Sequence, residues 1–227
     1  MGNRVFYQFP NAETADDSGL VVVTRSMNPD MVLSGYEQGI FAWSENPVRW
    51  YSPDPRAIFL NESIRIPRKL GKIIRRHDFQ VTFDQDFAGV LEACSKAHEQ
   101  RGGTWITQSF ISTYNELHRQ GYAHSVEVWQ DSSLVGGLYG VQINHFFAGE
   151  SMFFSVSNAS KIAFAALVKQ LELLDILLFD CQVINDHTHQ LGAVLMARGD
   201  YLKLLELSIK VNRMPTKWQP TPPVFYN

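Results

Sequence analysis

Residues 124–155 read HSVEVWQDSSLVGGLYGVQINHFFAGESMFFS, and their pattern is the main indication of the fold class. Apolar and polar side chains alternate over much of it, and turn-forming residues interrupt it at 131–133 and near 143–144. Alternation with a period of two is typical of β-strands, and short polar turns join neighbouring antiparallel strands. The stretch therefore predicts three strands in an antiparallel meander.

Helices and further strands are expected on both sides of the meander. Residues 158–174, NASKIAFAALVKQLELL, have the apolar spacing of an amphipathic helix, with Asn158 or Ser160 as its N-cap. The other expected elements are strands at 79–84, 176–184 and near 192–197, and helices over 87–94, 109–121 and near 200–210. Together they predict an α+β domain over residues 63–227 that ends in an extended, Pro-rich tail.

Residues 1–62 have a different character. A short helix is expected over 31–38, and Pro47, Pro53 and Pro55 then require extended or turned backbone. This pattern predicts a small N-terminal α/β domain over residues 1–62.

The composition bounds the class of protein. The chain has 227 residues, 45% of them hydrophobic and 19% charged, which is ample apolar material for a packed core. It has no apolar run of about 18 residues and no secretion signal, so a soluble, cytoplasmic protein is expected. Two cysteines are too few for a disulfide framework or a cysteine zinc site.

One segment is strongly basic, although the net charge of the chain is −3. Helical spacing places its cations along one side of a helix expected near 67–77. Such a run is usually a solvated face, but its single sign also suits contact with phosphates. The cations are Arg65, Arg68, Lys69, Lys72, Arg75 and Arg76.

Asp180 and Gln182 follow an apolar run at the end of a predicted strand. Side chains alternate along a strand, so these two share one face and Cys181 points to the other, into the core. An acid and an amide on one face can together hold a polar reacting group, and the alternative is a solvated strand end. A nucleophilic Cys181 is a weaker alternative, because a free cysteine is commonly a small core residue.

Glu150 lies in FFAGESMFF, residues 146–154, where its neighbours are apolar or small. Alternation places Met152 and Phe154 on its face, and a carboxylate there is costly to bury without a partner. Gly149 beside it permits close approach of a substrate. Glu150 is therefore a candidate site residue, with an ion pair or an edge position as the structural alternative.

Asp186, His187 and His189 are crowded like metal ligands. Two histidines at i and i+2 could face one ion, and the aspartate could add an oxygen ligand. The chain offers no recognisable further ligands at set spacing, so neither a metal nor a cofactor is expected. The glycines of GGLYG, residues 136–140, do not match a phosphate-binding loop.

Eight motifs occur in order along the chain: GIFAW, SPDPRAIF, GTWIT, GYAHSVEVW, LVGGLYG, GESMF, NASK and DCQVINDHTHQLGA. Together they resemble the leucyl/phenylalanyl-tRNA–protein transferases of bacteria over about residues 35–205. The resemblance implies an acetyltransferase-like (GNAT) fold for the C-terminal domain, with a mixed, largely antiparallel sheet. It also implies transfer of Leu or Phe, with Met as a further candidate, from aminoacyl-tRNA to an N-terminal Arg or Lys. The added residue would mark the acceptor protein for degradation by the N-end rule.

The resemblance further assigns residues. It implies that Asp180 and Gln182 act on the acceptor amine, with Asp180 as a base or an orienting group, and that Glu150 attracts the cationic acceptor. The substrate-binding residues that it implies are Trp43 and Trp105 for the terminal nucleotide and Leu138, Phe147, Met152 and Leu171 for the donor side chain. The tRNA-binding residues that it implies are Arg68, Lys69, Lys72, Arg75 and Arg76. The donor ester is already activated, so no cofactor is implied, and a monomer is expected.

Some residues depart from the family pattern. Ala42 replaces a proline, Phe154 and Gln190 stand where serine is common, and GLVVVTRSM at 19–27 replaces a Gly-Gly-Asp segment. Three other functions stay open. One is a related transferase for acidic acceptors, which Glu150 disfavours by charge. Another is an acyl-CoA N-acyltransferase, although residues 154–161 lack its pyrophosphate loop. The last is a non-enzymatic tRNA-binding module.

Overall fold

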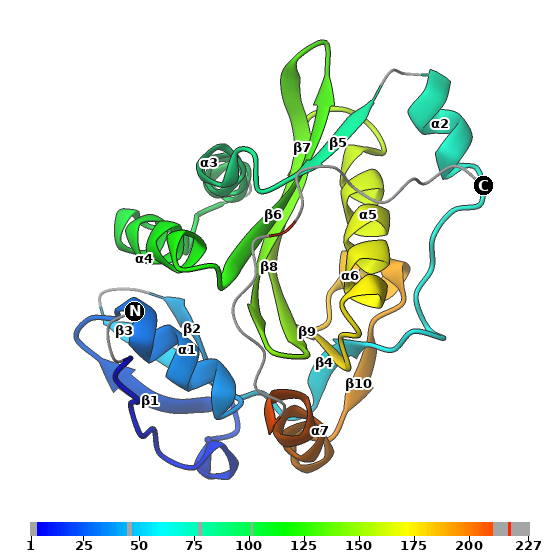
Figure 1. Cartoon of the computed structure of the whole chain (residues 1–227). Helices are drawn as coiled ribbons and strands as arrows, with labels where there is room; N and C mark the ends of the chain where they lie inside the picture. Colours follow the sequence, from blue (N-terminus) through cyan, green and yellow to red (C-terminus); the bar gives the residue numbers. More distant parts are fainter. Residues whose placement is uncertain (1–3, 45–46, 77–78, 101, 211–217, 219–227) are drawn as a thin grey trace.

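The structure is a computed structural model that describes residues 4–44, 47–76, 79–100, 102–210 and 218 (Figure 1). Its strands form two sheets, one of three strands in the order β1-β3-β2 and one of seven in the order β10-β4-β9-β8-β7-β6-β5. The strands are β1 (Leu20–Thr24), β2 (Phe41–Ser44), β3 (Val48–Tyr51), β4 (Arg56–Phe59), β5 (Gln80–Phe83), β6 (Ala123–Gln130), β7 (Ser133–Ile143), β8 (Phe146–Phe154), β9 (Leu178–Gln182) and β10 (Val194–Met196). The helices are η1 (Ala12–Thr14), α1 (Pro29–Glu37), α2 (Leu70–Arg76), α3 (Phe87–Glu99), α4 (Gln108–Arg119), α5 (Ala159–Leu173), α6 (Asp186–Leu191) and α7 (Arg198–Lys210).

The larger sheet confirms the predicted α+β class. Its neighbouring strands are antiparallel except β8 and β9, which are parallel, so the sheet is mixed and largely antiparallel as expected. The predicted meander is β6-β7-β8. Helix α5 packs on one face of this sheet, and α3 and α4 pack on the other (Figure 1). Alternation along β7 follows this division, because Leu138 lies in the core beneath α5 and Tyr139 in the core beneath α3.

The N-terminal unit is the smaller sheet together with α1. Asn28 caps α1, since its side chain accepts a hydrogen bond from the backbone N–H of Met31. Strand β4, in contrast, belongs to the larger sheet, where it lies between β10 and β9. The chain passes from one sheet to the other between Tyr51 and Arg56, ahead of the predicted domain boundary at residue 62. The short apolar run of β4 carries no signal of which sheet it joins.

The larger sheet opens between its two parallel strands. Pairing of β8 with β9 covers only Phe146–Ala148 against Leu178–Asp180. Beyond this point a bulge interrupts β8, because Gly149 pairs with Gly140 and Ser151 with Tyr139, which leaves Glu150 as the extra residue. A second irregularity interrupts β9, where Cys181 is skipped in the register with β4. Bulges redirect side chains and end regular pairing, so the two parallel strands separate at this point.

The basic helix, the segment around His187 and the C-terminal tail complete the fold. The basic helix expected near 67–77 is α2, which begins only at Leu70. The short helix α6, which was not predicted, holds Asp186, His187 and His189. The predicted tail lies outside the described residues except for Trp218, which is buried and stacks on His124. Within the described part of the chain, no helix is long and apolar enough to cross a membrane.

Candidate active site

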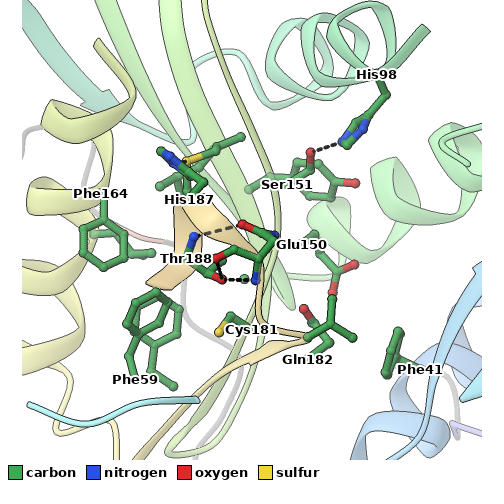
Figure 2. Close-up of a pocket in the computed structure, with 18 of the residues that line it drawn as sticks. Phe41, Phe59, His98, Glu150, Ser151, Phe164, Cys181, Gln182, His187 and Thr188 are labelled. Atoms are coloured by element: carbon green, nitrogen blue, oxygen red, sulfur yellow. Dashed lines mark hydrogen bonds between the residues drawn. The ribbon is translucent and has the colours of Figure 1, made fainter. Parts of the chain in front are cut away.

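A cavity of ≈530 Å³ lies where β8 and β9 separate (Figure 2). Side chains from the N-terminal unit, α3, α5 and α6 complete its walls. Its apolar members include Phe59, Leu138, Phe164, Leu167 and Phe179. Its polar members include His98, Glu150, Ser151, Gln182, Asn185 and Thr188. A concave site with an apolar part and a few convergent polar groups suits a ligand whose apolar side chain adjoins a polar reacting group.

Glu150 is the one carboxylate among the described residues that line this cavity. The bulge turns its side chain toward α1 and α4, where it accepts hydrogen bonds from the hydroxyl groups of Tyr36 and Tyr114. The expectation from alternation was therefore wrong for its neighbours: Met152 faces α6, where its sulfur lies 2.8 Å from Nε2 of His187. Burial raises the pKa of Glu150 to about 7, and the two tyrosine hydrogen bonds only partly counter that effect.

Gln182 lines the cavity, whereas Asp180 does not. Asp180 is completely buried, and the guanidinium of Arg56 binds both of its oxygens, with Nε 2.9 Å from Oδ1 and Nη2 2.7 Å from Oδ2. Asp180 therefore lies behind the cavity wall while Gln182 lines it, and the backbone between them leaves regular strand geometry, with Cys181 skipped in the register and Gln182 at a φ of +59°. Cys181 packs into the core, as expected, and also lines the cavity.

The hydrogen-bonding groups around Gln182 assign the orientation of its side-chain amide. With its nitrogen toward the strands, the side chain donates to the carbonyl oxygens of Gly149 and Cys181, each at 3.0 Å. The amide oxygen then points away from those two acceptors. Gln182 thus presents an acceptor oxygen at the place where β8 and β9 separate.

Aromatic rings form the apolar end of the cavity. Phe59 lies 5.0 Å from Phe164 and 4.7 Å from Phe179 between ring centroids. Figure 2 shows Phe59 and Phe164 on one side of the cavity, with His98 and Ser151 on the other. Behind these rings, Phe59 and Phe179 also border a second cavity of ≈180 Å³. The pair therefore separates two spaces.

The structure brings four of the six predicted substrate-binding residues to the main cavity and leaves two elsewhere. Trp43, Trp105, Leu138 and Met152 line it. Phe147 is fully buried in the core beneath α5, against Phe179 and Trp218. Leu171 lines the second cavity, because it follows Leu167 by one helical turn, or about 6 Å along the axis. These two predicted substrate-binding residues therefore lie outside the lining of the main cavity.

The two tryptophans occupy different walls. Trp43 lies on β2, is 38% exposed, and packs edge-on against Tyr51 at 5.8 Å between ring centroids. Trp105 precedes α4 and packs against His98 at 6.2 Å. Nε2 of His98 lies 2.9 Å from the hydroxyl oxygen of Ser151. The rim of the cavity therefore offers aromatic faces beside hydrogen-bonding groups.

The predicted histidine cluster does not converge on one point. Asp186 begins α6, and Asn185 caps this helix in a reciprocal pair of hydrogen bonds with Thr188. His187 lines the cavity, and His189 lies in the last turn of the same helix. Among the residues that the structure describes, no three His, Cys, Asp or Glu side chains are grouped so that they could hold a metal ion.

The basic segment lies apart from the cavity lining. Leu70 and Ile74 of α2 pack into the core beneath α5, so this helix is attached on the α5 side of the sheet (Figure 1). The six cations from Arg65 to Arg76 are all exposed. They form a one-signed surface, which we call the basic surface.

Sequence reasoning missed three groups of the site. Arg56 stands in an otherwise apolar strand, and its charge there was a signal that it needs a buried partner. Tyr36 is adjacent to the GIFAW motif, which gave it no chemical role. Tyr114 looks like an ordinary apolar position of α4, and nothing in the sequence connects it to Glu150.

Comparisons with known proteins agree with the geometry. A sequence model described as leucyl/phenylalanyl-tRNA protein transferase matches residues 58–206, and the model of that family's N-terminal domain matches residues 25–54. The transferase of this name from Cellvibrio japonicus (strain Ueda107) is 45% identical over 202 residues, with 87% of this chain and 86% of the relative covered. The one from Shewanella baltica (strain OS155 / ATCC BAA-1091) is 42% identical over 221 residues, with 95% and 93% covered.

Solved structures give weaker matches. A ribosomal-protein-alanine N-acetyltransferase from Brucella melitensis biovar Abortus 2308 aligns with 42% of this chain and 72% of its own, at a TM-score of 0.31 and 14% identity.

Proposed function

Because the chain belongs to the leucyl/phenylalanyl-tRNA–protein transferase family, we propose that this enzyme transfers Leu or Phe from aminoacyl-tRNA to an N-terminal Arg or Lys of acceptor proteins. The observation that carries the proposal is a cavity with aromatic rings at one end and Glu150 and Gln182 at the other. The reaction would take place in the cytoplasm, where aminoacyl-tRNA is available, and would need no partner other than its two substrates.

The chemistry is aminolysis of an ester. The α-amine of the acceptor attacks the carbonyl carbon of the aminoacyl group, a C–N bond forms, and the C–O bond to the terminal ribose breaks. The amine loses a proton and the ribose oxygen gains one. An N-terminal amine has an ordinary pKa of about 7.7–8.0, so a fraction of it is already neutral at pH 7. The site must therefore supply alignment and a proton acceptor.

The donor side chain fits the apolar end of the cavity. Leu138 and Met152 adjoin the rings of Phe59, Phe164 and Phe179 there. Methionine adapts to side chains of different shape, which suits a pocket for both Leu and Phe, with Met as a further candidate donor. Trp43 and Trp105 would stack against the terminal adenosine, where stacking is worth roughly 1–3 kcal/mol for each base.

The acceptor enters at the polar end. Glu150 carries a negative charge above about pH 7 and attracts both the α-ammonium group and the cationic side chain of an N-terminal Arg or Lys. The pKa of this carboxylate, about 7, is close to the pKa of the α-amine, and the carboxylate takes the proton that the amine loses. The amide oxygen of Gln182 accepts a hydrogen bond from the attacking amine and aligns it. An acidic acceptor would meet Glu150 with like charge.

The basic surface would bind the acceptor stem of the tRNA. Its cations can contact phosphates without reading the base sequence, which is appropriate for an enzyme that accepts more than one tRNA. This would allow a chain of net charge −3 to bind RNA.

The test is a transfer assay with labelled Leu-tRNA and two reporter proteins that differ only in their first residue, Arg or Asp. We expect label on the Arg reporter only. A parallel reaction with labelled acetyl-CoA tests for an acyl-CoA transferase, and we expect no label from it. Label on neither reporter from Leu-tRNA, or label from acetyl-CoA, would contradict the proposal.

A further inference from the structure

Asp180 makes hydrogen bonds through both of its oxygens, and these bonds lie behind the cavity wall. Oδ1 accepts from Nε of Arg56 and from the backbone N–H of Gln182, both at 2.9 Å. Oδ2 accepts from Nη2 of Arg56 at 2.7 Å and from the hydroxyl of Tyr201 at 3.2 Å. The side chains of Asp180 and Arg56 are both 0% exposed. A carboxylate surrounded in this way has no oxygen available to an acceptor amine.

Arg56 is held as firmly as its partner. Nη1 donates to the carbonyl oxygen of Gly39 at 3.1 Å, and the guanidinium carbon lies 4.8 Å from the ring of Phe41 and 4.5 Å from the ring of Tyr201. Burial disfavours its charge, but the carboxylate of Asp180 outweighs that effect and raises the pKa of Arg56. Arginine is suited to such a place because its planar fork matches a carboxylate at two points.

The ion pair is linked to the lining of the cavity through one backbone group, the N–H of Gln182. Gln182 has a left-handed backbone, which a residue with a side chain adopts only when its surroundings stabilise it. The hydrogen bond from its N–H to Asp180 supplies that stabilisation. The conformation in turn directs the amide of Gln182 to Gly149 on the neighbouring strand. Loss of the ion pair would therefore release Gln182 although Arg56 touches no substrate.

We propose that Arg56 is a positioning residue of the transfer reaction: it fixes Asp180, and Asp180 fixes the backbone of Gln182 so that the amide oxygen meets the acceptor amine. This inference rests on the proposed function. It gives Asp180 an orienting role rather than that of proton acceptor. It also connects the N-terminal unit, through Gly39 and Phe41, to the strand that carries Gln182.

The experiment measures steady-state kinetics with labelled Leu-tRNA and the Arg reporter. For Arg56→Met we expect kcat to fall about a hundredfold, as for an aligning group displaced by an ångström, while KM for Leu-tRNA stays within about twofold. Asp180→Asn should lower kcat in the same way, and the double variant Arg56→Met/Asp180→Asn should be no worse than the poorer single variant. Arg56→Lys should recover part of kcat, because a lysine keeps the charge but loses the fork.

A matched control is Arg198→Met. Arg198 is also an ion-paired arginine, but it binds Asp54 and the carbonyl oxygen of Ser52 and does not line the cavity. We expect this variant to keep kcat. If Arg56→Met does not fold, Tyr201→Phe removes one hydrogen bond from Asp180 and keeps the ring, and its kcat should fall severalfold with an unchanged circular dichroism spectrum.

The pH profile separates the two roles of Asp180. If Asp180 orients Gln182, Asp180→Asn keeps the shape of the wild-type profile at reduced height. Loss of its acidic limb would make Asp180 the proton acceptor and overturn the inference. Unchanged kcat in both Arg56→Met and Tyr201→Phe would also overturn it. In either case wild-type transfer to the Arg reporter would stand, whereas a wild-type enzyme without that transfer would contradict the proposed function itself.

Discussion

Tyr36 of α1 donates a hydrogen bond to the carboxylate of Glu150 on β8, although 114 positions separate the two residues. Tyr114 of α4 donates to the other oxygen of the same carboxylate at 3.2 Å. Both hydroxyl groups are neutral donors, so they stabilise the ionised form without cancelling its charge. Burial disfavours the charged carboxylate by more than these two hydrogen bonds favour it, so the pKa of Glu150 rises to about 7. A carboxylate with this pKa changes its charge in the range where N-terminal amines begin to lose theirs.

The first prediction concerns the pH dependence of transfer. The active form of Glu150 is the carboxylate, so kcat/KM should fall as the pH drops below about 7. The acceptor amine must also be neutral, and its pKa of about 7.7–8.0 adds a second ionisation. Two ionisations make the wild-type rate fall by about a hundredfold per pH unit well below both pKa values. The measurement is kcat/KM from pH 5 to 9 at constant ionic strength.

Glu150→Gln is the control for that profile. It keeps the shape of the side chain and removes the titrating group, so its activity should be lower and should fall by only about tenfold per pH unit, from the amine alone. An unchanged steepness would mean that Glu150 does not titrate in the reaction.

A second prediction follows from the two tyrosines. Hydrogen bonds to the ionised form lower the pKa of Glu150, so Tyr36→Phe should raise that pKa further. A hydrogen bond to a charged group is worth about 1.5–3 kcal/mol, which corresponds to a shift of at least one pH unit in the lower limb. Tyr139→Phe is the matched control, since Tyr139 borders the same cavity and its buried hydroxyl has no hydrogen-bond partner among the described residues. A profile of Tyr36→Phe that coincides with that of Tyr139→Phe would contradict the assignment.

Local pattern predicted much of the larger sheet because its signals are local. The meander β6-β7-β8 and the helix α5 follow from alternation and helical spacing within short windows. The place of β4 between β9 and β10 could not be predicted in that way. Its four residues, Arg56–Phe59, pair with residues that lie 120 or more positions further along the chain. Such pairing depends on tertiary contacts that a short apolar run does not encode.

The site was predictable only as far as alternation holds. Leu138 was expected in the donor pocket and lies at the cavity on a regular strand. Glu150 and Cys181 are the extra residues of two irregular pairings, and beyond the first of these Met152 no longer lies on the same face as Glu150. A bulge is specified by both strands of a pair, so one strand's sequence does not reveal it. Arg56 was missed for the same reason, because its partner Asp180 is distant in the chain.

A third prediction concerns the choice of donor. Phe179 and Phe59 separate the main cavity from the second one of ≈180 Å³. Phe179→Val should join the two spaces and favour a larger donor side chain. We expect the ratio of kcat/KM for Phe-tRNA over Leu-tRNA to rise by about tenfold or more, the range over which apolar pockets discriminate by size. Competition between the two charged tRNAs measures this ratio directly.

Leu171→Ala provides the comparison for Phe179→Val. Leu171 borders only the second cavity, so its truncation enlarges a space that the donor does not enter while Phe59 and Phe179 remain. The donor ratio should stay as in the wild type. A shift with Leu171→Ala as large as with Phe179→Val would show that the two rings do not bound the donor pocket.

The last prediction concerns the basic surface. Arg68, Lys69 and Lys72 are exposed on and beside α2, on the α5 side of the sheet. Their combined replacement by alanine should raise KM for aminoacyl-tRNA and leave kcat nearly unchanged, because phosphate contacts contribute to binding rather than to the chemical step. The dependence of log KM on log salt concentration should become less steep by about 0.7–0.9 for each phosphate that the variant no longer binds.

Lys203 and Lys210 serve as controls, since both are exposed cations of α7, which lies at the other end of the molecule (Figure 1). Their replacement should change neither KM nor its salt dependence. Equal effects from both sets would mean that tRNA binding depends only on the net charge of the protein. The basic surface would then have no specific role in tRNA binding.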